Sequence, residues 1–222
     1  QLDIDQIRVL ALVNLERISE AKEFLESHKL EFSKNIDICR FIVAKVEERW
    51  DECLTLLERI PSYKELGQEE EITNYTGRAR ILFRLERLKE ALSTVEYLLQ
   101  KYPCSEMART ECCLALIDIG EISRAKELIE SAQLNEEDDR SIKLALSEKY
   151  CETAAWLQAV ATLRQIENMD SDEEALTLLI YCQVGAGLNH AACVNARKLR
   201  ALVGGPVDGV TLHVELQNYF YR

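Results

Sequence analysis

The sequence LERLKEA at residues 85–91 is the clearest copy of a short pattern that recurs along the chain. In each copy an apolar residue is followed, three positions later, by a small one. The small residues are Ala21, Cys53, Ala91, Ala125, Ala159 and Ala191, and the steps between them are 32, 38, 34, 34 and 32 residues. Such a period is typical of repeat proteins in which each copy is one supersecondary unit.

The composition favours helices within these units. The chain has 222 residues, of which 47% are apolar and 30% charged, with only 8 Gly and 3 Pro. Gly and Pro destabilise a helix interior by roughly 1 and 3 kcal/mol each, so their scarcity permits long helices. The sequence therefore predicts an all-α fold.

The pattern resembles the tetratricopeptide repeat family, whose period is about 34 residues. Further residues that match the family are Tyr75, Ala79, Pro103 and Gly120, of which Gly120 is the only glycine at the expected turn position. The resemblance implies a right-handed α-solenoid of six helix-turn-helix hairpins over residues 1–203. Residues 204–222 would then form a capping helix or the truncated start of a further repeat.

Packing and capping chemistry agree with this interpretation. Two antiparallel helices approach closely where one offers a small side chain, and the apolar residue three positions earlier, such as Trp156, closes the turn. Each hairpin gains a core only by stacking on the next one. Asn135 and the sequence SDEE at residues 171–174 predict helix N-termini, and residues 61–71 predict a longer loop between two units.

Net charge, apolar run length and cysteine content limit the partners and the cellular location that we expect. The chain has 27 basic and 39 acidic residues, for a net charge of −12. This balance disfavours nucleic acid, whose affinity for proteins depends mainly on Lys and Arg. No apolar run reaches the 18 to 20 residues or so that a membrane span requires. The eight cysteines include no C-x-x-C pair, which favours free thiols and a cytoplasmic location.

The sequence offers no catalytic motif. The three histidines are far apart and none has metal-ligand spacing, and no phosphate-binding or serine-hydrolase pattern is present. Cys112 and Cys113 are adjacent, but neighbouring residues of a helix point about 100° apart, so the two thiols are expected not to face each other. We expect no metal or cofactor, and a protein that is not an enzyme.

The family resemblance places a binding groove on the first helices of successive hairpins. Residues expected to line it are Ile42, Lys45, Thr76, Arg80, Phe83, Arg84, Leu114, Ile117 and Glu148. Arg80 and Arg84 share one helical face and could hold a carboxylate or an acidic segment. The alternative is that they pair with acids of the chain itself, such as Glu48 or Glu111.

The favoured function is therefore a scaffold that binds a peptide or protein segment in this groove. A sensor or regulatory domain that binds a small ligand or short peptide is the alternative. RNA binding, which a similar helical repeat performs, requires a basic groove and conflicts with the net charge. Because the chain begins at Gln1 and the pattern stops at Arg222, we expect it to be part of a longer protein.

Overall fold

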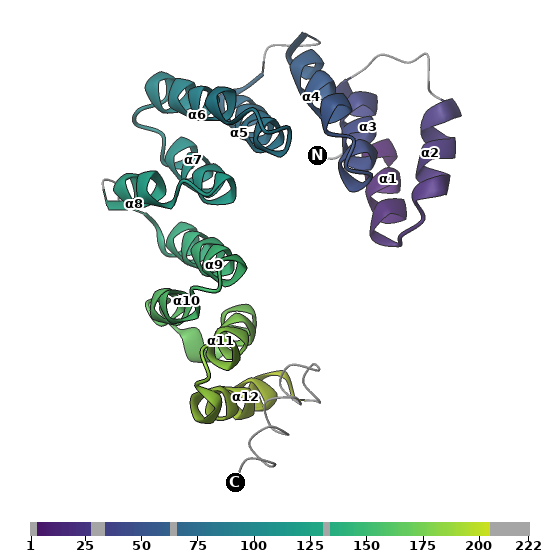
Figure 1. Cartoon of the computed structure of the whole chain (residues 1–222). Helices are drawn as coiled ribbons and strands as arrows, with labels where there is room; N and C mark the ends of the chain where they lie inside the picture. The colour runs from purple at the N-terminus through teal and green to yellow at the C-terminus, as the bar shows by residue number, and fades with distance from the viewer. Residues whose placement is uncertain (1–3, 28–33, 63–65, 131–133, 205–222) are drawn as a thin grey trace. The chain divides into compact units, whose positions relative to one another are not determined.

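The computed structural model describes residues 4–27, 34–62, 66–130 and 134–204, and every regular element in these ranges is a helix (Figure 1). The helices are α1 (Ile4–Asn14), α2 (Ile18–Ser27), α3 (Lys34–Val46), α4 (Trp50–Arg59), α5 (Gln68–Arg84), α6 (Leu88–Lys101), α7 (Glu106–Ile119), α8 (Ile122–Glu130), α9 (Glu136–Glu152), α10 (Trp156–Leu163), α11 (Glu173–Gly185) and α12 (Asn189–Val203), with short 3-10 turns η1 (Ile60–Ser62) and η2 (Met169–Ser171). The all-α prediction is confirmed for these residues.

Polar side chains cap the N-termini of α9 and α11. Asn135 accepts a hydrogen bond from the backbone N–H of Asp138 at 2.9 Å, as its position before an acidic run predicts. The cap of α11 is Asp172, which accepts from the backbone N–H of Ala175 at 3.0 Å. Ser171 belongs to η2 and donates to the carbonyl of Asn168 instead, so the capping residue lies one position later than the SDEE pattern predicts.

Six turns in the described chain share one backbone geometry. In each, the residue two positions before the following helix has a positive φ; these residues are Glu16, Glu48, Glu86, Gly120, Ala154 and Gly187. The next backbone N–H then donates to the carbonyl five residues earlier, as from Arg87 to Leu82 at 2.8 Å. This is the Schellman arrangement that ends many helices. Gly187 thus joins Gly120 as a turn glycine, although the family pattern placed a turn glycine at Gly120 alone.

Five of the six predicted small residues are buried near the start of a helix. Ala21, Cys53, Ala91, Ala125 and Ala159 have no exposed surface, and each is the fourth residue of its helix. In the last turn the equivalent residue is Ala192, which is fully buried, whereas the predicted Ala191 is half-buried. The prediction is off by one residue because α12 begins at Asn189 rather than at Leu188.

The first three turns also share a side-chain pair. An arginine directly before the second helix of each pair bonds to the glutamate three residues later. The pairs are Arg17–Glu20 at 2.6 Å, Arg49–Glu52, and Arg87–Glu90 at 2.7 Å. Together with the positive-φ glutamate before each arginine, they form a local pattern of Glu-Arg-apolar-x-Glu.

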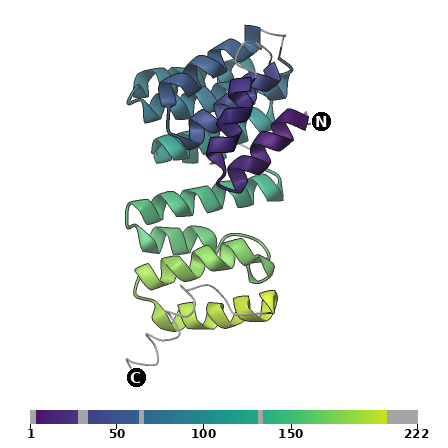
Figure 2. The same ribbon diagram turned by 90° about the vertical axis from the view of Figure 1, so that its right-hand side faces the viewer.

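The chain forms two compact units, residues 1–115 and 116–222, with the boundary inside α7. In the first unit α1 packs on α3, and α3 on α4. In the second unit α9, α10, α11 and α12 follow one another as a stack of layers (Figure 2), and α9 also packs on α11. Among α1 to α6 and among α9 to α12, the helix contacts join hairpin partners or helices of successive hairpins.

Six of the eight thiols lie in the interior. Cys53 fills one of the small-residue positions, and Cys112 and Cys113 are both buried. Burial raises the pKa of each of the last two thiols to about 12. The Cys112 thiol donates to the carbonyl of Val95, with Sγ 3.9 Å from the oxygen. These cysteines therefore act as small packing residues.

Two further predictions concern the end of the chain and the membrane. Gly204 ends α12 in the left-handed conformation, and the predicted cap or further repeat beyond it lies outside the described residues. Among the helices that the structure describes, none combines the length and the hydropathy needed to cross a bilayer.

Candidate functional site

Two of the residues predicted to line the groove lie in the interior instead. Thr76 has no exposed surface, and its hydroxyl donates to the carbonyl of Ile72 at 3.0 Å within α5. Ile117 is only 1% exposed. Both side chains lie on the packed side of their helices, so neither can touch a partner on the surface, and these two assignments are wrong.

The remaining predicted residues reach the surface to different degrees. Those that are half-buried are Ile42, Arg80, Phe83 and Leu114, and those that are exposed are Lys45, Arg84 and Glu148. Ile42 packs against the core cluster of α1, α2 and α3 that contains Val9 and Val43. Ile42 therefore belongs mainly to the hydrophobic core, and only part of its side chain reaches the surface.

Arg80 already has an acidic neighbour in the first unit. Its Nη2 atom lies 3.7 Å from Oε2 of Glu111, one of the two acids considered as intramolecular partners. Arg84 lies one helical turn further along α5 and is exposed. The pairing alternative thus holds for Arg80, whereas Arg84 offers an accessible cation beside Phe83.

Glu148 lies in an acidic part of the second unit. Although Glu148 is classed with the exposed residues, neighbouring atoms partly desolvate its carboxyl and raise its pKa, and the negative charges of Glu174, Asp118 and Glu152 raise it further. A second group of acids on a partner would add to this repulsion. The surroundings of Glu148 therefore do not suit an acidic segment.

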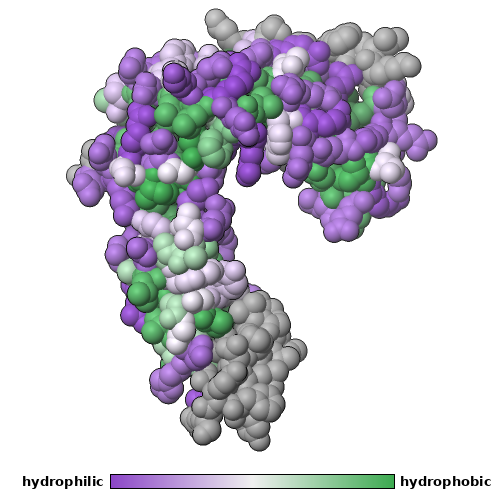
Figure 3. Space-filling view, viewed as in Figure 1, coloured by the Kyte–Doolittle hydropathy of each residue, from purple (hydrophilic) through white to green (hydrophobic). Residues whose placement is uncertain are grey.

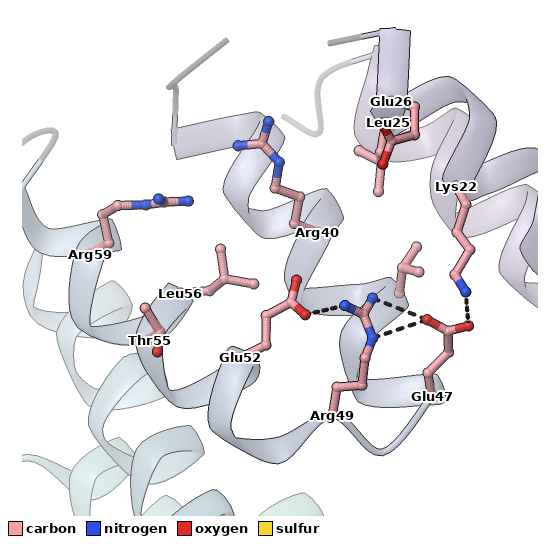
Figure 4. Close-up of a pocket in the computed structure, with 11 residues that line it drawn as sticks. Lys22, Leu25, Glu26, Arg40, Glu47, Arg49, Glu52, Thr55, Leu56 and Arg59 are labelled. Atoms are coloured by element: carbon pink, nitrogen blue, oxygen red, sulfur yellow. Dashed lines mark hydrogen bonds and ion pairs between the residues drawn. The ribbon is translucent and has the colours of Figure 1, made fainter. Parts of the chain in front are cut away.

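A cleft that the sequence did not predict opens between α2, α3 and α4, entirely within the first unit (Figure 4). Its volume is about 880 Å³. Leu25, Val43 and Leu56, one from each helix, form an apolar floor whose side chains are 9%, 1% and 4% exposed. The floor continues the hydrophobic core to the surface.

Ion pairs form one wall of the cleft. Arg49 lies between Glu52 and Glu47, and its Nη2 atom is 3.0 Å from Oε2 of Glu47 (Figure 4). Lys22 reaches the same Glu47 from α2. The bond from Lys22 and the charge of Arg49 hold the pKa of Glu47 below its ordinary value. This wall links α2 to the turn between α3 and α4.

A buried carboxylate organises the other wall. Asp37 in α3 has no exposed surface and accepts hydrogen bonds from two arginines that line the cleft. Nη1 of Arg40 is 2.9 Å from Oδ1 of Asp37, and Nε of Arg59 is 2.5 Å from Oδ2. The Arg59 bond ties the end of α4 to α3. Charge-assisted bonds of this kind fix the orientation of both guanidinium groups.

This arrangement is suited to binding. Its lining includes four cations and three acids, so charges of both signs surround the apolar floor. Within the described ranges no three His, Cys, Asp or Glu side chains gather as metal ligands. The family resemblance led away from the cleft because the cleft lies partly on second helices. The Arg-x-x-Glu pair at Arg49 does not distinguish it, since the same pair occurs at Arg17 and Arg87.

Comparison with known proteins identifies no family for this chain. No protein-family model, curated protein or solved structure matches this chain. Its function is therefore inferred from its own residues.

Proposed function

We propose that this chain is a protein-interaction module whose six helical hairpins stack as a right-handed solenoid of tetratricopeptide-like repeats. The observation that carries the proposal is the turn that recurs six times, at steps of 32, 38, 34, 34 and 33 residues. A buried small residue follows each turn at the same distance. Repeats of this kind commonly expose extended binding surfaces.

The cleft between α2, α3 and α4 is the proposed peptide site. Its volume accommodates several side chains, and an apolar side chain of the partner would cover Leu25 and Leu56. The near balance of charge along the walls implies that apolar contact supplies the affinity and that charged flanks set the orientation. Apolar residues also reach the surface in separate patches on the face shown in Figure 3.

A steric block of the cleft tests this site. Thr55 is exposed, lines the cleft, and its hydroxyl bonds to the carbonyl of Asp51 in its own helix. Thr73 is an equally exposed residue of α5 with the same kind of bond, to Glu69, and it does not line the cleft. Thr55→Trp would fill the cleft, and Thr73→Trp is its matched control.

The measurement is a titration of short peptides selected from a displayed random library against the purified chain. We expect saturable binding that Thr55→Trp weakens by about tenfold or more, whereas Thr73→Trp leaves it unchanged. Selection of no peptide, or equal binding by both variants, would contradict the proposal.

Arg84 provides a separate test of the acidic-partner hypothesis. If an acidic segment lies along α5, Arg84→Glu should weaken its binding, because an attraction becomes a repulsion. Lys89→Glu, which makes the same charge change at an exposed position of α6, is the control. Equal effects of the two variants would indicate a general charge effect and remove Arg84 from the site.

The size of the cleft also favours a second candidate function, a sensor domain that binds a small ligand. Pockets for small molecules commonly have volumes of roughly 300 to 1,000 Å³. A ligand that binds only the folded chain raises its melting temperature. We expect Thr55→Trp to abolish any such shift found in a metabolite screen, and a screen without any shift would leave the peptide function as the better candidate.

A further inference from the structure

Two thiols of the second unit face each other between α9 and α11. Sγ of Cys151 lies 3.1 Å from Sγ of Cys182, although the two residues are 31 positions apart. The helices that carry them belong to successive hairpins and pack directly on each other. Because a disulfide holds its sulfur atoms about 2.05 Å apart, an approach of about 1 Å would allow a bond.

The pair also has an accessible member. Cys151 is partly exposed, whereas Cys182 is completely buried beside it. An oxidant can therefore reach Cys151 first, and Cys182 is in place to react with the product. Cys104 is an exposed free cysteine outside this pair, which makes it an internal comparison.

We propose that Cys151 and Cys182 form a modification site, a dithiol that a hydroperoxide converts into an intramolecular disulfide joining α9 to α11. This inference does not rest on the proposed binding function. The bond would tie the fifth hairpin to the sixth covalently.

The reaction balances in two steps. The Cys151 thiolate attacks the terminal oxygen of the hydroperoxide, whose O–O bond breaks to leave an alcohol, or water from hydrogen peroxide, and a sulfenic acid on Cys151. Cys182 then attacks the Cys151 sulfur, the S–S bond forms, and the hydroxyl leaves as water with the proton of Cys182. Two thiols lose two electrons and two protons, and the hydroperoxide gains them.

The surroundings of the pair predict a slow first step. Burial raises the pKa of Cys151 and of Cys182, so little thiolate is present at neutral pH. The test is therefore run in mildly alkaline buffer with hydrogen peroxide as the oxidant, followed by alkylation of the remaining thiols.

Mass spectrometry of tryptic peptides identifies the bond. Trypsin places Cys151 in the peptide 150–164 and Cys182 in the peptide 165–197, which also contains Cys193. We expect these two peptides to be linked in the oxidised chain and in Cys193→Ala, but not in Cys151→Ser or Cys182→Ser. Fragmentation of the linked peptides from the oxidised chain without substitutions assigns the bond even if a variant fails to fold.

Oxidation should also raise the melting temperature by roughly 5 to 10 °C, because a cross-link over some 30 residues restricts the unfolded chain. A reducing agent should reverse the shift. The proposal is wrong if oxidation gives only intermolecular dimers through Cys104, a bond to Cys193, or no link between the two peptides.

Discussion

Glu86 has a backbone conformation that disfavours any residue with a side chain. Its φ of 60° lies in the left-handed region, where a non-glycine residue costs about 1 to 2 kcal/mol. Glycine adopts this conformation freely but loses somewhat more entropy on folding. We therefore expect Glu86→Gly to raise the free energy of unfolding by about 0.5 to 1 kcal/mol, as measured by urea denaturation.

The reciprocal change is the control for this prediction. Gly120 occupies the same turn position with a φ of 90°, and a Cβ there would meet only the end of Lys149, at 3.9 Å. Because space is available, Gly120→Ala isolates the conformational cost, and we expect a loss of about 1 kcal/mol. Equal stability of both variants and the wild type would show that these turns do not depend on the residue at this position.

Gly185 is required for a close helix contact. A Cβ at this position would lie 2.5 Å from Cδ2 of Trp156, inside the contact distance of a bulky ring that also packs edge-on against Tyr181. Gly185→Ala should therefore destabilise the chain by about 1 to 2 kcal/mol. Gly77→Ala in α5 is the matched control, because its Cβ would lie 3.5 Å from Leu57. There we expect a gain of about 0.5 to 1 kcal/mol from helix propensity, and a gain at both positions would contradict the prediction.

Asp172 joins two first helices through its charge. It caps α11 and accepts bonds from Arg140 of α9, from Nε at 2.5 Å and Nη2 at 2.9 Å. The bonds from Arg140 hold the pKa of Asp172 below its ordinary value of 3.8. The resulting stability is present above that value and is lost as the pH falls through the lowered pKa of the folded chain.

Asp172→Asn isolates this contribution, because asparagine also caps helices but carries no charge. We expect the variant to be about 1 kcal/mol less stable than the wild type near pH 7. The difference should shrink as the pH falls below 3.8. Urea denaturation of both proteins across this range measures it, and a difference that does not change with pH would assign the effect to capping alone.

Helices and their packing positions could be predicted from the sequence because they depend on local patterns. The small residue of each copy is repeated at nearly constant steps, and it identifies a buried position near the start of a helix even when it is a cysteine, as at Cys53. The shift from Ala191 to Ala192 arose because Leu188 and Ala191 match the apolar and small pattern one position early, whereas α12 begins at Asn189, two residues after the positive-φ Gly187 as in the other turns.

The candidate site could not be predicted in the same way. Thr76 and Ile117 were assigned to a surface by family resemblance, but which side of a helix is exposed depends on the neighbours that cover it. The cleft depends on contacts between residues far apart in the sequence, such as Arg59 with Asp37, 22 positions apart. In the cleft, ion pairs lie beside apolar residues of the floor. Hydrophobic periodicity alone does not indicate where such core residues reach the surface.

Local packing has a consequence for the stability of the whole chain. Among α1 to α6 and among α9 to α12, a helix contacts its hairpin partner or the next hairpin, as α9 contacts α10 and α11. In a repeat protein, stability is the sum of the stabilities of the units and of the interfaces between neighbours. A substitution in one hairpin should then affect distant hairpins little.

Hydrogen exchange of the Gly185→Ala variant tests this locality. Because Gly185 and Trp156 belong to the last two hairpins, we expect amides of α10, α11 and α12 to exchange about tenfold faster than in the wild type. Amides of α3, α4 and α5 should keep their protection, since in the described part of the chain these helices pack on α1, α2, α6 and one another and not on the helix that carries the altered residue. If protection fell equally in both units, the chain would unfold as one cooperative body, and the proposal of a repeat array with independent neighbour interfaces would have to be abandoned.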